Sequence, residues 1–480
     1  MTLTPLPRRT RKKSRAGNPW LGLIAAAPLA LGALPAQAGP LAFDAALQQM
    51  QQRSDRLAAA RSAIDSAQLR RDALQRLGGP VVSLSGAAYA YNANLDVDLN
   101  PLNRVLPGLV SQLPPQLAGP IAQLPQLPSS YTLNRHKSDA SASVAAVWPL
   151  YLGGATDAAR GVLDAQAHEA EADAAKTGHE ATTLLVQYYF GAQLAERAAV
   201  LREAALATIE QHDAAAQKML DAGVISRVER LQARSALEEA RRNARKARDD
   251  ADLAATALTR TLRAGERVTP TSPLFVLNQP LPPLPQFIDT ALARHPGLDK
   301  VAAKKEQATQ LHAAQEALRK PQVFAFGQRQ LKSGRDADWV AGVGVRWTLW
   351  DSIDRDALAE SSLRQVEQAE RTGAQAQSDI ALLVEKRWLG VEQARRQFFA
   401  LAPGLELAGE VLRLRTAGLA AGTSTTLDLI DAQTNLAKAQ TERAQAAHDY
   451  VKALADLLES CGLSDDFGSY MARADAMKVE

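Results

Sequence analysis

The sequence predicts a mainly α-helical protein with a small β part, built from two internal repeats. Three observations lead to this prediction. The chain is 46% hydrophobic but only 5% aromatic, a composition typical of helices rich in Ala and Leu. Two spans of 68 residues each, 155–222 and 354–421, contain only one proline between them, Pro403. The segment "AGTSTTLDLIDAQTNLAKAQ", which begins at Ala421, also repeats in register the segment "AGVISRVERLQARSALEEAR", which begins at Ala222.

Length and charge restrict the class of protein. The 480 residues are too many for one compact core. The formal net charge of +3 is misleading, because the first 38 residues hold six basic residues and no acidic one. The remainder has 49 basic and 52 acidic residues. Since it has no basic excess, we expect no nucleic-acid partner.

Residues 1–38 have the pattern of a secretory signal peptide. A basic start is followed by the apolar run "WLGLIAAAPLALGALP" and by Ala-Gln-Ala at Ala36–Ala38. This pattern favours cleavage after Ala38 over a retained anchor. The single cysteine, Cys461, lies near the other end, so no lipid-accepting cysteine follows the signal. No later run approaches about 18 consecutive apolar residues, which leaves an exported soluble protein or a β-barrel.

The duplication extends upstream of the quoted segments. Trp347 follows Trp148 by 199 residues, the same spacing that separates Gly422 from Gly223. Before the tryptophans the first copy is longer, and its extra residues lie in the Leu/Pro segment "LPGLVSQLPPQLAGPIAQLPQLPSS". So many prolines exclude a regular helix or a central strand, and we expect a long surface loop there.

These landmarks divide the chain. A second Pro-rich stretch between the copies is either a linker or an irregular packed segment. The expected divisions are a signal peptide at 1–38, a first repeat at 39–263, a Pro-rich linker at 264–286, a second repeat at 287–462 and a C-terminal tail at 463–480. The first repeat is expected to contain strands at about 81–91 and 139–151, a long loop at 92–138 and a helical hairpin at 155–263. The second is expected to contain strands at about 321–331 and 339–351 and a helical hairpin at 354–460.

The strands before the tryptophans alternate apolar and polar residues over about 11 positions, the length of a strand that crosses a membrane. Each alternation continues to a tryptophan, Trp148 or Trp347, which places an aromatic side chain at the level of the membrane interface. A half-buried strand of a soluble protein has the same pattern. The strands alone do not decide between these two readings.

The two long helical spans are rods of about 100 Å at 1.5 Å per residue. Glycines 161, 178 and 191 in the first rod and the "APG" at 402–404 in the second are expected to bend or interrupt them. The following helices carry a heptad with a small residue at one place in every seven, which lets a neighbouring helix approach closely. The alanines of this seam are Ala233, Ala240, Ala247 and Ala254 in the first copy, and Ala432, Ala439, Ala446 and Ala453 in the second.

A tight turn joins each rod to the next helix. Its glycine suits the left-handed residue that ends a helix, and a Ser or Thr three residues later begins the next one. An acidic residue follows three positions further, as a capping box requires, and Asp fits this place less well than Glu. The turn residues are Gly223, Ser226, Gly422 and Thr425, and the acidic residues are Glu229 and Asp428.

The signal peptide, the duplication, the strand pairs and the turn segments resemble the outer-membrane efflux protein family, the TolC family, over nearly all of residues 39–462. The resemblance implies a homotrimer in which each chain gives four strands to a shared outer-membrane β-barrel, while the helices form a long coiled-coil barrel through the periplasm. It implies an exit duct for efflux or type I secretion, located in the outer membrane. The implied partners are a periplasmic adaptor (membrane fusion) protein, an inner-membrane pump and outer-membrane lipid.

The resemblance also implies an acidic periplasmic constriction at Asp428, Asp431 and Glu229. Helix capping explains Asp428 and Glu229 equally well, but Asp431 lies beyond the cap. The chain resembles the non-lipidated branch of the family. Family members often place a basic residue just after the second turn's glycine to hold the channel closed. Here that turn reads "GTSTT", while the first turn is followed by Arg227 and Arg230.

No nucleotide-binding loop, G-x-S-x-G or H-E-x-x-H motif occurs in the sequence. We therefore expect no enzymatic activity, no catalytic residue, no cofactor and no metal site. A second function class remains open from the residues alone, namely a periplasmic coiled-coil scaffold or adaptor protein without a barrel.

Overall fold

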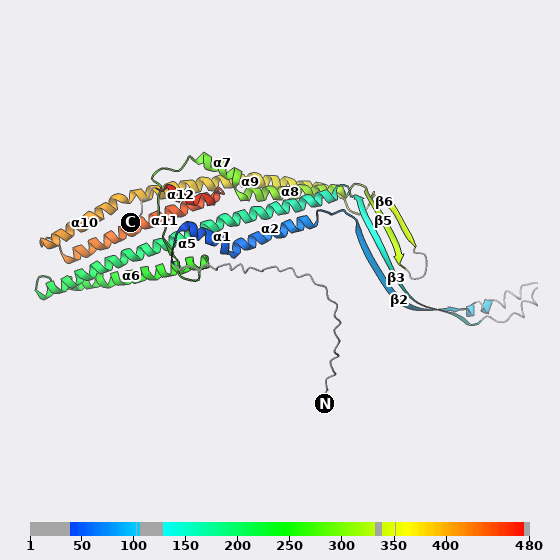
Figure 1. Cartoon of the computed structure of the whole chain (residues 1–480), viewed down its shortest axis with the longest axis horizontal. Coiled ribbons are helices and arrows are strands. Elements are labelled where there is room, and N and C mark those ends of the chain that lie inside the picture. Colours follow the sequence, from blue (N-terminus) through cyan, green and yellow to red (C-terminus); the bar gives the residue numbers. More distant parts are fainter. Residues whose placement is uncertain (1–38, 102, 106–127, 332–337, 351, 475–480) are drawn as a thin grey trace, which may run out of the picture.

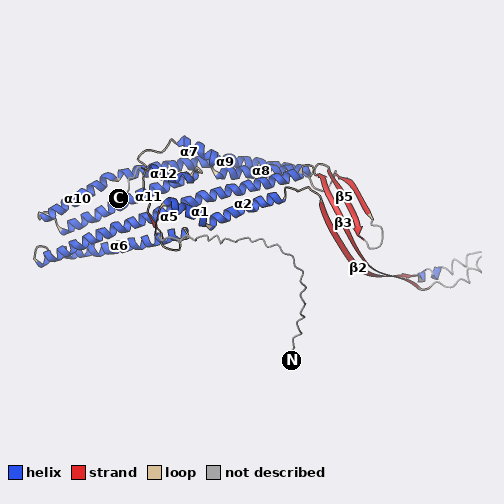
Figure 2. Cartoon of the chain, in the orientation of Figure 1, coloured by secondary structure: helices blue, strands red, loops and turns tan. Residues whose placement is uncertain are grey.

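The computed structural model describes residues 39–474 except 102, 106–127, 332–337 and 351. The predicted signal peptide and the centre of the Leu/Pro segment lie outside the described residues. The molecule is elongated, with its helices lying side by side at one end and its strands at the other (Figure 1). Figure 2 shows this separation of helices and strands directly.

The two repeats have the same order of elements: two shorter helices, two strands, a long helix or helix pair, and a final long helix. The first repeat consists of α1 (Phe43–Arg53), α2 (Asp55–Ala73), β2 (Val81–Asp98), β3 (Ser130–Tyr151), α5 (Ala155–Asp221) and α6 (Arg227–Thr261). The second consists of α7 (Leu284–Arg294), α8 (Pro296–Ala317), β5 (Gln322–Leu331), β6 (Trp339–Arg346), α9 (Arg355–Ala400), α10 (Ala402–Ala420) and α11 (Thr426–Ser460).

The four long strands form one antiparallel sheet in the order β2-β3-β5-β6. The expected strand bounds of the first repeat were too short, because pairing continues from Val81↔Val147 to Asp98↔Ser130. The expected loop at 92–138 is therefore wrong at both ends. All prolines of the expected loop lie between Pro101 and Pro128, so the residues on either side keep the backbone N–H groups that the ladder needs. The expected strand at 339–351 was too long, since β6 ends at Arg346.

Helix α5 has 67 residues and runs without a break through Gly161, Gly178 and Gly191. The expected interruption there is wrong, because a glycine costs a helix only about 1 kcal/mol and keeps its backbone N–H. In the second repeat the rod does break, since α9 ends at Ala400 and α10 begins at Ala402 with Pro403 in its first turn. Proline lacks the N–H that would continue the hydrogen-bond ladder.

The main hydrophobic core lies midway along the helices, where α5 and α11 cross the short helices. Phe43, Phe190, Phe275 and Phe467 form a cluster with ring centroids 5.0–6.0 Å apart. Beside it the buried hydroxyl of Tyr189 donates to the Leu41 carbonyl at 2.6 Å and accepts from the backbone N–H groups of Thr271 and Ser272. This hydroxyl holds together β1 (Pro40–Leu41) and β4 (Thr269–Pro270), a small parallel pair.

The Pro-rich stretch at 264–286 is a packed segment rather than a free linker. Its apolar side chains Leu274, Phe275, Val276 and Leu281 are buried in the main core. The buried carboxylate of Glu392 on α9 accepts from the Leu281 N–H at 3.0 Å. Burial of an apolar segment without regular structure is possible here because side chains satisfy its backbone groups.

The expected C-terminal tail at 463–480 is also packed as far as the structure describes it. A 3-10 turn, η1 (Ser464–Asp466), leads into α12 (Phe467–Arg473). Phe467 is 1% exposed and sits in the aromatic cluster. Among the described residues, no helix combines the length and the apolar character needed to cross a bilayer.

Candidate functional site at the hairpin tips

Both helical hairpins end at the same pole of the molecule, opposite the sheet (Figure 1). Each turn contains a glycine in the left-handed region, Gly223 with φ 71° and Gly422 with φ 74°. The residue after each glycine donates its N–H back to the helix, Val224 to Met219 and Thr423 to Gly418, both at 2.8 Å. Glycine has no side chain to oppose this conformation, so the repeated turn favours a repeated glycine.

Capping boxes begin the two returning helices. In the first, Glu229 donates its N–H to the Ser226 hydroxyl at 3.2 Å, and its carboxylate accepts the Ser226 N–H at 2.7 Å. In the second, Asp428 and Thr425 exchange the same two bonds at 3.1 and 2.9 Å. The backbone hydrogen bond from the cap residue is the main cause that lowers the pKa of each carboxyl group. Both side chains are therefore carboxylates at neutral pH.

A basic residue lies beside the second cap. Arg415, on the descending helix α10, places a guanidinium nitrogen 3.8 Å from the Asp428 carboxylate. The sequence comparison considered only basic residues that follow Gly422, and it therefore did not identify Arg415. Arg415 precedes the turn, and its position relative to Asp428 follows from the pairing of α10 with α11. The only sign of it in the sequence is an arginine seven residues before Gly422, and such a spacing is not specific by itself.

Arg230 of the first copy has a different role. It is 9% exposed, and its guanidinium contacts both oxygens of Asp213 on α5 at 2.5 and 3.2 Å and the Gln217 amide oxygen at 2.7 Å. It therefore ties α6 to α5 inside one hairpin. Arg227, in contrast, is exposed at the start of α6.

Asp431 lies one helical turn after Asp428 and is exposed. It borders a small groove of about 100 Å³ between the two hairpins, together with Arg202, Ala240 and Ile430. Ile430 itself is 1% exposed and packs in a second apolar cluster with Ile209 and Leu237. Asp431 thus stands at the junction of the hairpins, next to the apolar contact that holds them together.

The seam alanines are partly used within one chain. Three of them are buried: Ala233, Ala432 and Ala446. The other five are half-buried: Ala240, Ala247, Ala254, Ala439 and Ala453. Within the first hairpin the contact with α5 is made mainly by the residues four places after each seam alanine, which include Leu237, Ala244, Ala251 and Leu258. The seam therefore keeps accessible surface for a further helix.

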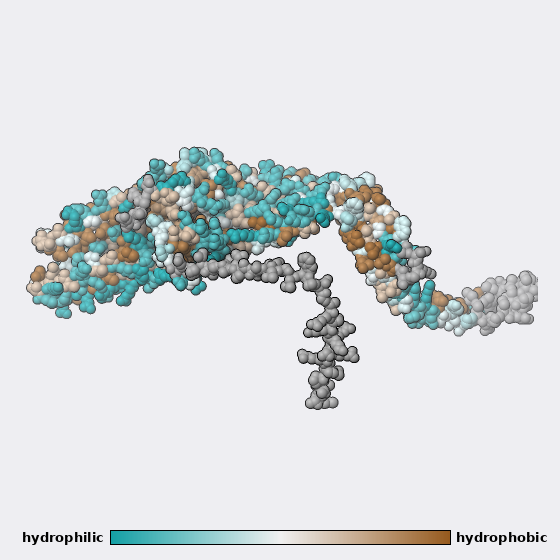
Figure 3. All heavy atoms as spheres, in the orientation of Figure 1, coloured by the Kyte–Doolittle hydropathy of each residue, from teal (hydrophilic) through white to brown (hydrophobic). Residues whose placement is uncertain are grey.

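The sheet exposes an apolar face, visible as brown residues in Figure 3. Trp148 is 50% and Trp347 57% exposed, and the Trp347 indole donates to the Arg319 carbonyl at 3.2 Å. The strand register assembles this face from the following apolar residues: Val82, Leu84, Val144, Ala146, Trp148, Val323, Ala325, Trp339, Val343 and Val345. It also places Arg329 between Val144 and Trp339, at the end remote from the helices. The opposite face carries Ser83, Ser85, Ser141, Ser143, Gln328 and Gln330 near its centre.

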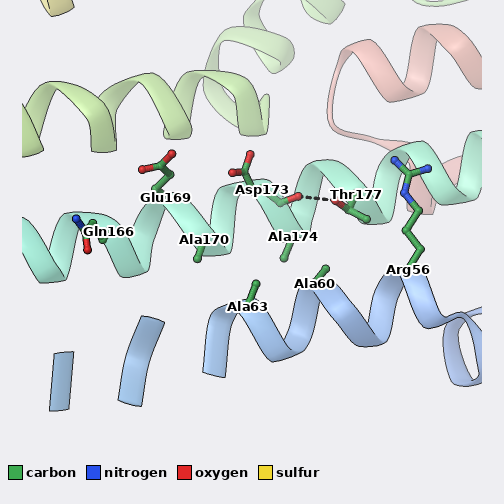
Figure 4. Close-up of a pocket in the computed structure, with 9 residues that line it drawn as sticks. All are labelled: Arg56, Ala60, Ala63, Gln166, Glu169, Ala170, Asp173, Ala174 and Thr177. Atoms are coloured by element: carbon green, nitrogen blue, oxygen red, sulfur yellow. Dashed lines mark hydrogen bonds between the residues drawn. The ribbon is translucent and has the colours of Figure 1, made fainter. Parts of the chain in front are cut away.

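A groove between α2 and α5 holds about 390 Å³ and is shown in Figure 4. Alanines from both helices face each other across it, while Glu169 and Asp173 point away from α2. Those carboxylates pair instead with Lys300 and Lys304 of α8. The centre of the groove is therefore lined by alanine methyl groups, and the carboxylates of Glu169 and Asp173 do not face into it. Among the described residues, no group of three or more His, Cys, Asp or Glu side chains is placed to hold a metal ion.

Comparison with known proteins gives consistent results. A curated relative, the outer membrane efflux protein BepC of Brucella suis biovar 1, is 27% identical over 418 residues, which are 82% of this chain and 88% of the relative. The outer membrane channel CmeC of Campylobacter jejuni matches with a TM-score of 0.69 at 12% identity, covering 91% of this chain and 90% of that one. The open state of the MtrE outer membrane channel of Neisseria gonorrhoeae matches with a TM-score of 0.67 at 17% identity, covering 88% of each chain.

The family model described as outer membrane efflux protein matches residues 46–262 and 287–463. These two segments make up most of the chain and contain both strand pairs and both helical hairpins. This protein therefore belongs to the outer membrane efflux protein family.

Proposed function

We propose that the protein is a passive exit duct in which three identical chains form one tube. The single observation that carries this proposal is the placement of two equivalent hairpin tips at one pole and a four-stranded sheet at the other (Figure 1). Three chains then supply six tips to a ring and twelve strands to a barrel. Residues 39–263 and 287–462 are the two channel repeats, a division that the two matched segments support.

The sheet supports the closed tube. Within the chain, β2 and β6 each pair on one side only. Pairing β2 with β6 of the next copy satisfies both edges and leaves no free strand. The apolar face then meets lipid, with Trp148 and Trp347 at the interface, and the serine- and glutamine-bearing face lines the pore. A scaffold or adaptor without a barrel would leave the apolar face in water, which argues against that alternative.

The tips form the narrow end of the tube. Asp428 and Glu229 hold equivalent positions, so one level of the ring carries six carboxylates, and Asp431 adds three at the next level. Because both capping boxes are formed, Asp428 and Glu229 also stabilise their helices. Asp431 takes no part in a capping box, so its charge is the clearest probe of the constriction. Crowded carboxylates at a lumen favour cations and bind multivalent ones.

Arg415 adds a positive charge beside one of these carboxylates. We infer that it offsets part of the ring's negative charge and takes the place of the basic residue that the second turn lacks. The half-buried seam alanines are the surfaces on which adjacent copies pack, except Ala240, which borders the groove between the two hairpins of one chain. A periplasmic adaptor protein and an inner-membrane pump would meet the tip end, because the other end is in the outer membrane.

Two experiments test the proposal. The protein should fractionate with the outer membrane and run on gels as a trimer that heating converts to a monomer. Asp431→Asn should assemble normally, and in single-channel recordings it should prefer cations less strongly and be blocked less by a trivalent cation. Arg415→Gln should prefer cations more strongly and be blocked more. A soluble periplasmic protein, or unchanged recordings in both Asp431→Asn and the double variant Asp428→Asn/Asp431→Asn, would exclude the proposed constriction.

The topology has its own test. The Leu/Pro segment and its flanks, roughly 92–135, join the two strands at the ends remote from the helices, so we propose that they face the outside of the cell. An epitope placed in this segment should bind antibody on intact cells. Binding only after lysis would reverse the proposed orientation.

A further inference from the structure

The hairpin of β2 and β3 extends well beyond the sheet. Strand β5 pairs with β3 only from Ala142 onward, so residues 88–98 and 130–140 pair with each other alone. These residues are called the ribbon here. Its strands have 11 residues each, about 37 Å at ~3.4 Å per residue. Figure 1 shows the hairpin continuing past the ends of β5 and β6.

The two faces of the hairpin exchange character where the ribbon begins. In the sheet, the face with even-numbered residues of β2 is apolar and holds Val82 and Leu84. In the ribbon the same face begins with Ala88 and Ala90 and is polar from Asn92 onward. The other face holds the stacked rings of Tyr89 and Tyr91 opposite the charged Asp139 and Lys137, and it becomes apolar only beyond Arg135. A strand that remained in lipid would keep one apolar face throughout. The ribbon is therefore built for a different environment.

The apolar face of the ribbon ends in four large side chains. The register sets Leu95 opposite Leu133 and Val97 opposite Tyr131, and these residues form the apolar quartet. They are 58%, 48%, 41% and 58% exposed, respectively. On the reverse face at the same level lie Asn94, Asp96, Thr132 and Asn134. One face is thus suited to water, while the other exposes apolar surface that water does not favour.

A ribbon of two strands with both edges unpaired is marginally stable in water by itself. Among the residues that the structure describes, β6 is the strand left to pair with β2 of another copy. Its 8 residues are too few to cover the 18 residues of β2. We propose that the ribbons of three copies pack their apolar quartets against one another over the mouth of the pore and form a second, extracellular constriction. This inference rests on the proposed trimeric duct.

Length and local concentration favour a second copy of the chain as the partner. A barrel of twelve strands spaced by about 4.8 Å and tilted by about 40° has a radius of roughly 12 Å. A ribbon of about 37 Å can therefore reach the central axis and meet its equivalents there. Because three ribbons are held on one rim, the effective concentration of each ribbon around the others is of about the millimolar order. An external partner of equal affinity would have to be present at a higher concentration to compete.

Charge is consistent with self-association. The ribbon contains three acidic residues, Asp96, Asp98 and Asp139, and two basic ones, Arg135 and Lys137. Lys137 and Asp139 form an ion pair at 3.2 Å on the same strand. The face of the quartet carries Asp139, Lys137 and Arg135, a net formal charge of only +1, so ribbons of different copies repel one another weakly. A surface built for phosphate-rich lipid or nucleic acid would carry a clear basic excess instead.

Cysteine cross-linking tests the proposal. Leu133→Cys is placed in the apolar quartet, and Asn134→Cys, the next residue on the opposite face, is the matched control. The native Cys461 is fully buried and does not interfere. With an oxidant or a short bismaleimide applied to intact cells, Leu133→Cys should give a covalent dimer from up to two-thirds of the chains, since a trimer forms one disulfide and leaves one thiol. Asn134→Cys should give at least tenfold less.

Trimer assembly is measured on the same samples, so that failure of the duct and failure of the inference are distinguishable. A heat-modifiable trimer in which Leu133→Cys reacts with an impermeant maleimide but gives no dimer overturns the inference. Equal cross-linking of the two variants also overturns it, because a ribbon without a fixed packing face would bring both positions together equally often. If Leu133→Cys assembles poorly, Val97→Cys with Asp96→Cys as control provides the same comparison on the partner strand.

Discussion

Removing Arg230 should loosen the tip of the first hairpin. The side chains of Arg230 and Asp213 are 11% and 14% exposed, so the pair is largely withdrawn from water. Arg230→Leu leaves the Asp213 carboxylate and the Gln217 amide oxygen without their shared donor. Breaking a buried ion pair by removing one partner costs about 3–5 kcal/mol, mostly because the remaining charge stays desolvated.

The second repeat shows how the same place is filled without charge. At the repeat spacing of 199 residues, Arg230 corresponds to Leu429 and Asp213 to Leu412. Leu429 is 1% exposed, and Leu412 is half-buried. The double variant Arg230→Leu/Asp213→Leu therefore copies the second repeat into the first. Since replacing a buried ion pair by apolar residues is often neutral or stabilising, we expect the double variant to recover most of the loss.

Hydrogen exchange measured by mass spectrometry on the purified trimer reads this local stability. A loss of about 3 kcal/mol speeds exchange through local opening by roughly 100-fold, because each 1.4 kcal/mol is a factor of ten. Peptides covering 205–235 should show this change in Arg230→Leu and stay within about threefold of wild type in the double variant. Peptides covering 405–435 serve as the internal control. Unchanged exchange in the single variant, or equally fast exchange in both variants, would refute the reasoning.

Three further predictions follow from burial. Ala240→Leu/Ala439→Leu should reduce the yield of trimer, because both alanines are half-buried beside close helix contacts and overpacking costs about 1–3 kcal/mol; a wild-type yield on native gels would speak against the seam. Burial lowers the pKa of His448 from 6.5, so the folded state binds its proton less readily than the unfolded state, and thermal stability should fall as pH drops below about 6.5. His448→Gln should flatten that decline between pH 7 and 5, and an identical decline in the variant would show that other groups cause it. Burial raises the pKa of the Cys461 thiol to about 11, so iodoacetamide at pH 8 should alkylate it only in denaturant, and labelling of the folded trimer would contradict the burial.

The tips illustrate how far sequence alone can reach. A glycine in each turn, a hydroxyl three residues later and an acid three beyond that are local requirements of a helix end, so they are readable from a short window. The structure places Ser226 with Glu229 and Thr425 with Asp428 in this way. Arg415 and the Arg230–Asp213 pair were not found, because their partners lie on the opposite helix of the hairpin and only the packing of two helices brings them together.

The sequence by itself determined the periodic features of this protein: the duplication, the long helices, the alternating strands and the repeated turns. Each follows from a spacing along the chain that backbone geometry imposes on every protein. The tertiary structure alone decided that 264–286 is packed, that α12 closes the core and that β2 and β3 continue into the ribbon. These segments have no strong local pattern, and their conformation is set by surfaces and hydrogen-bonding groups contributed by residues far away in the chain.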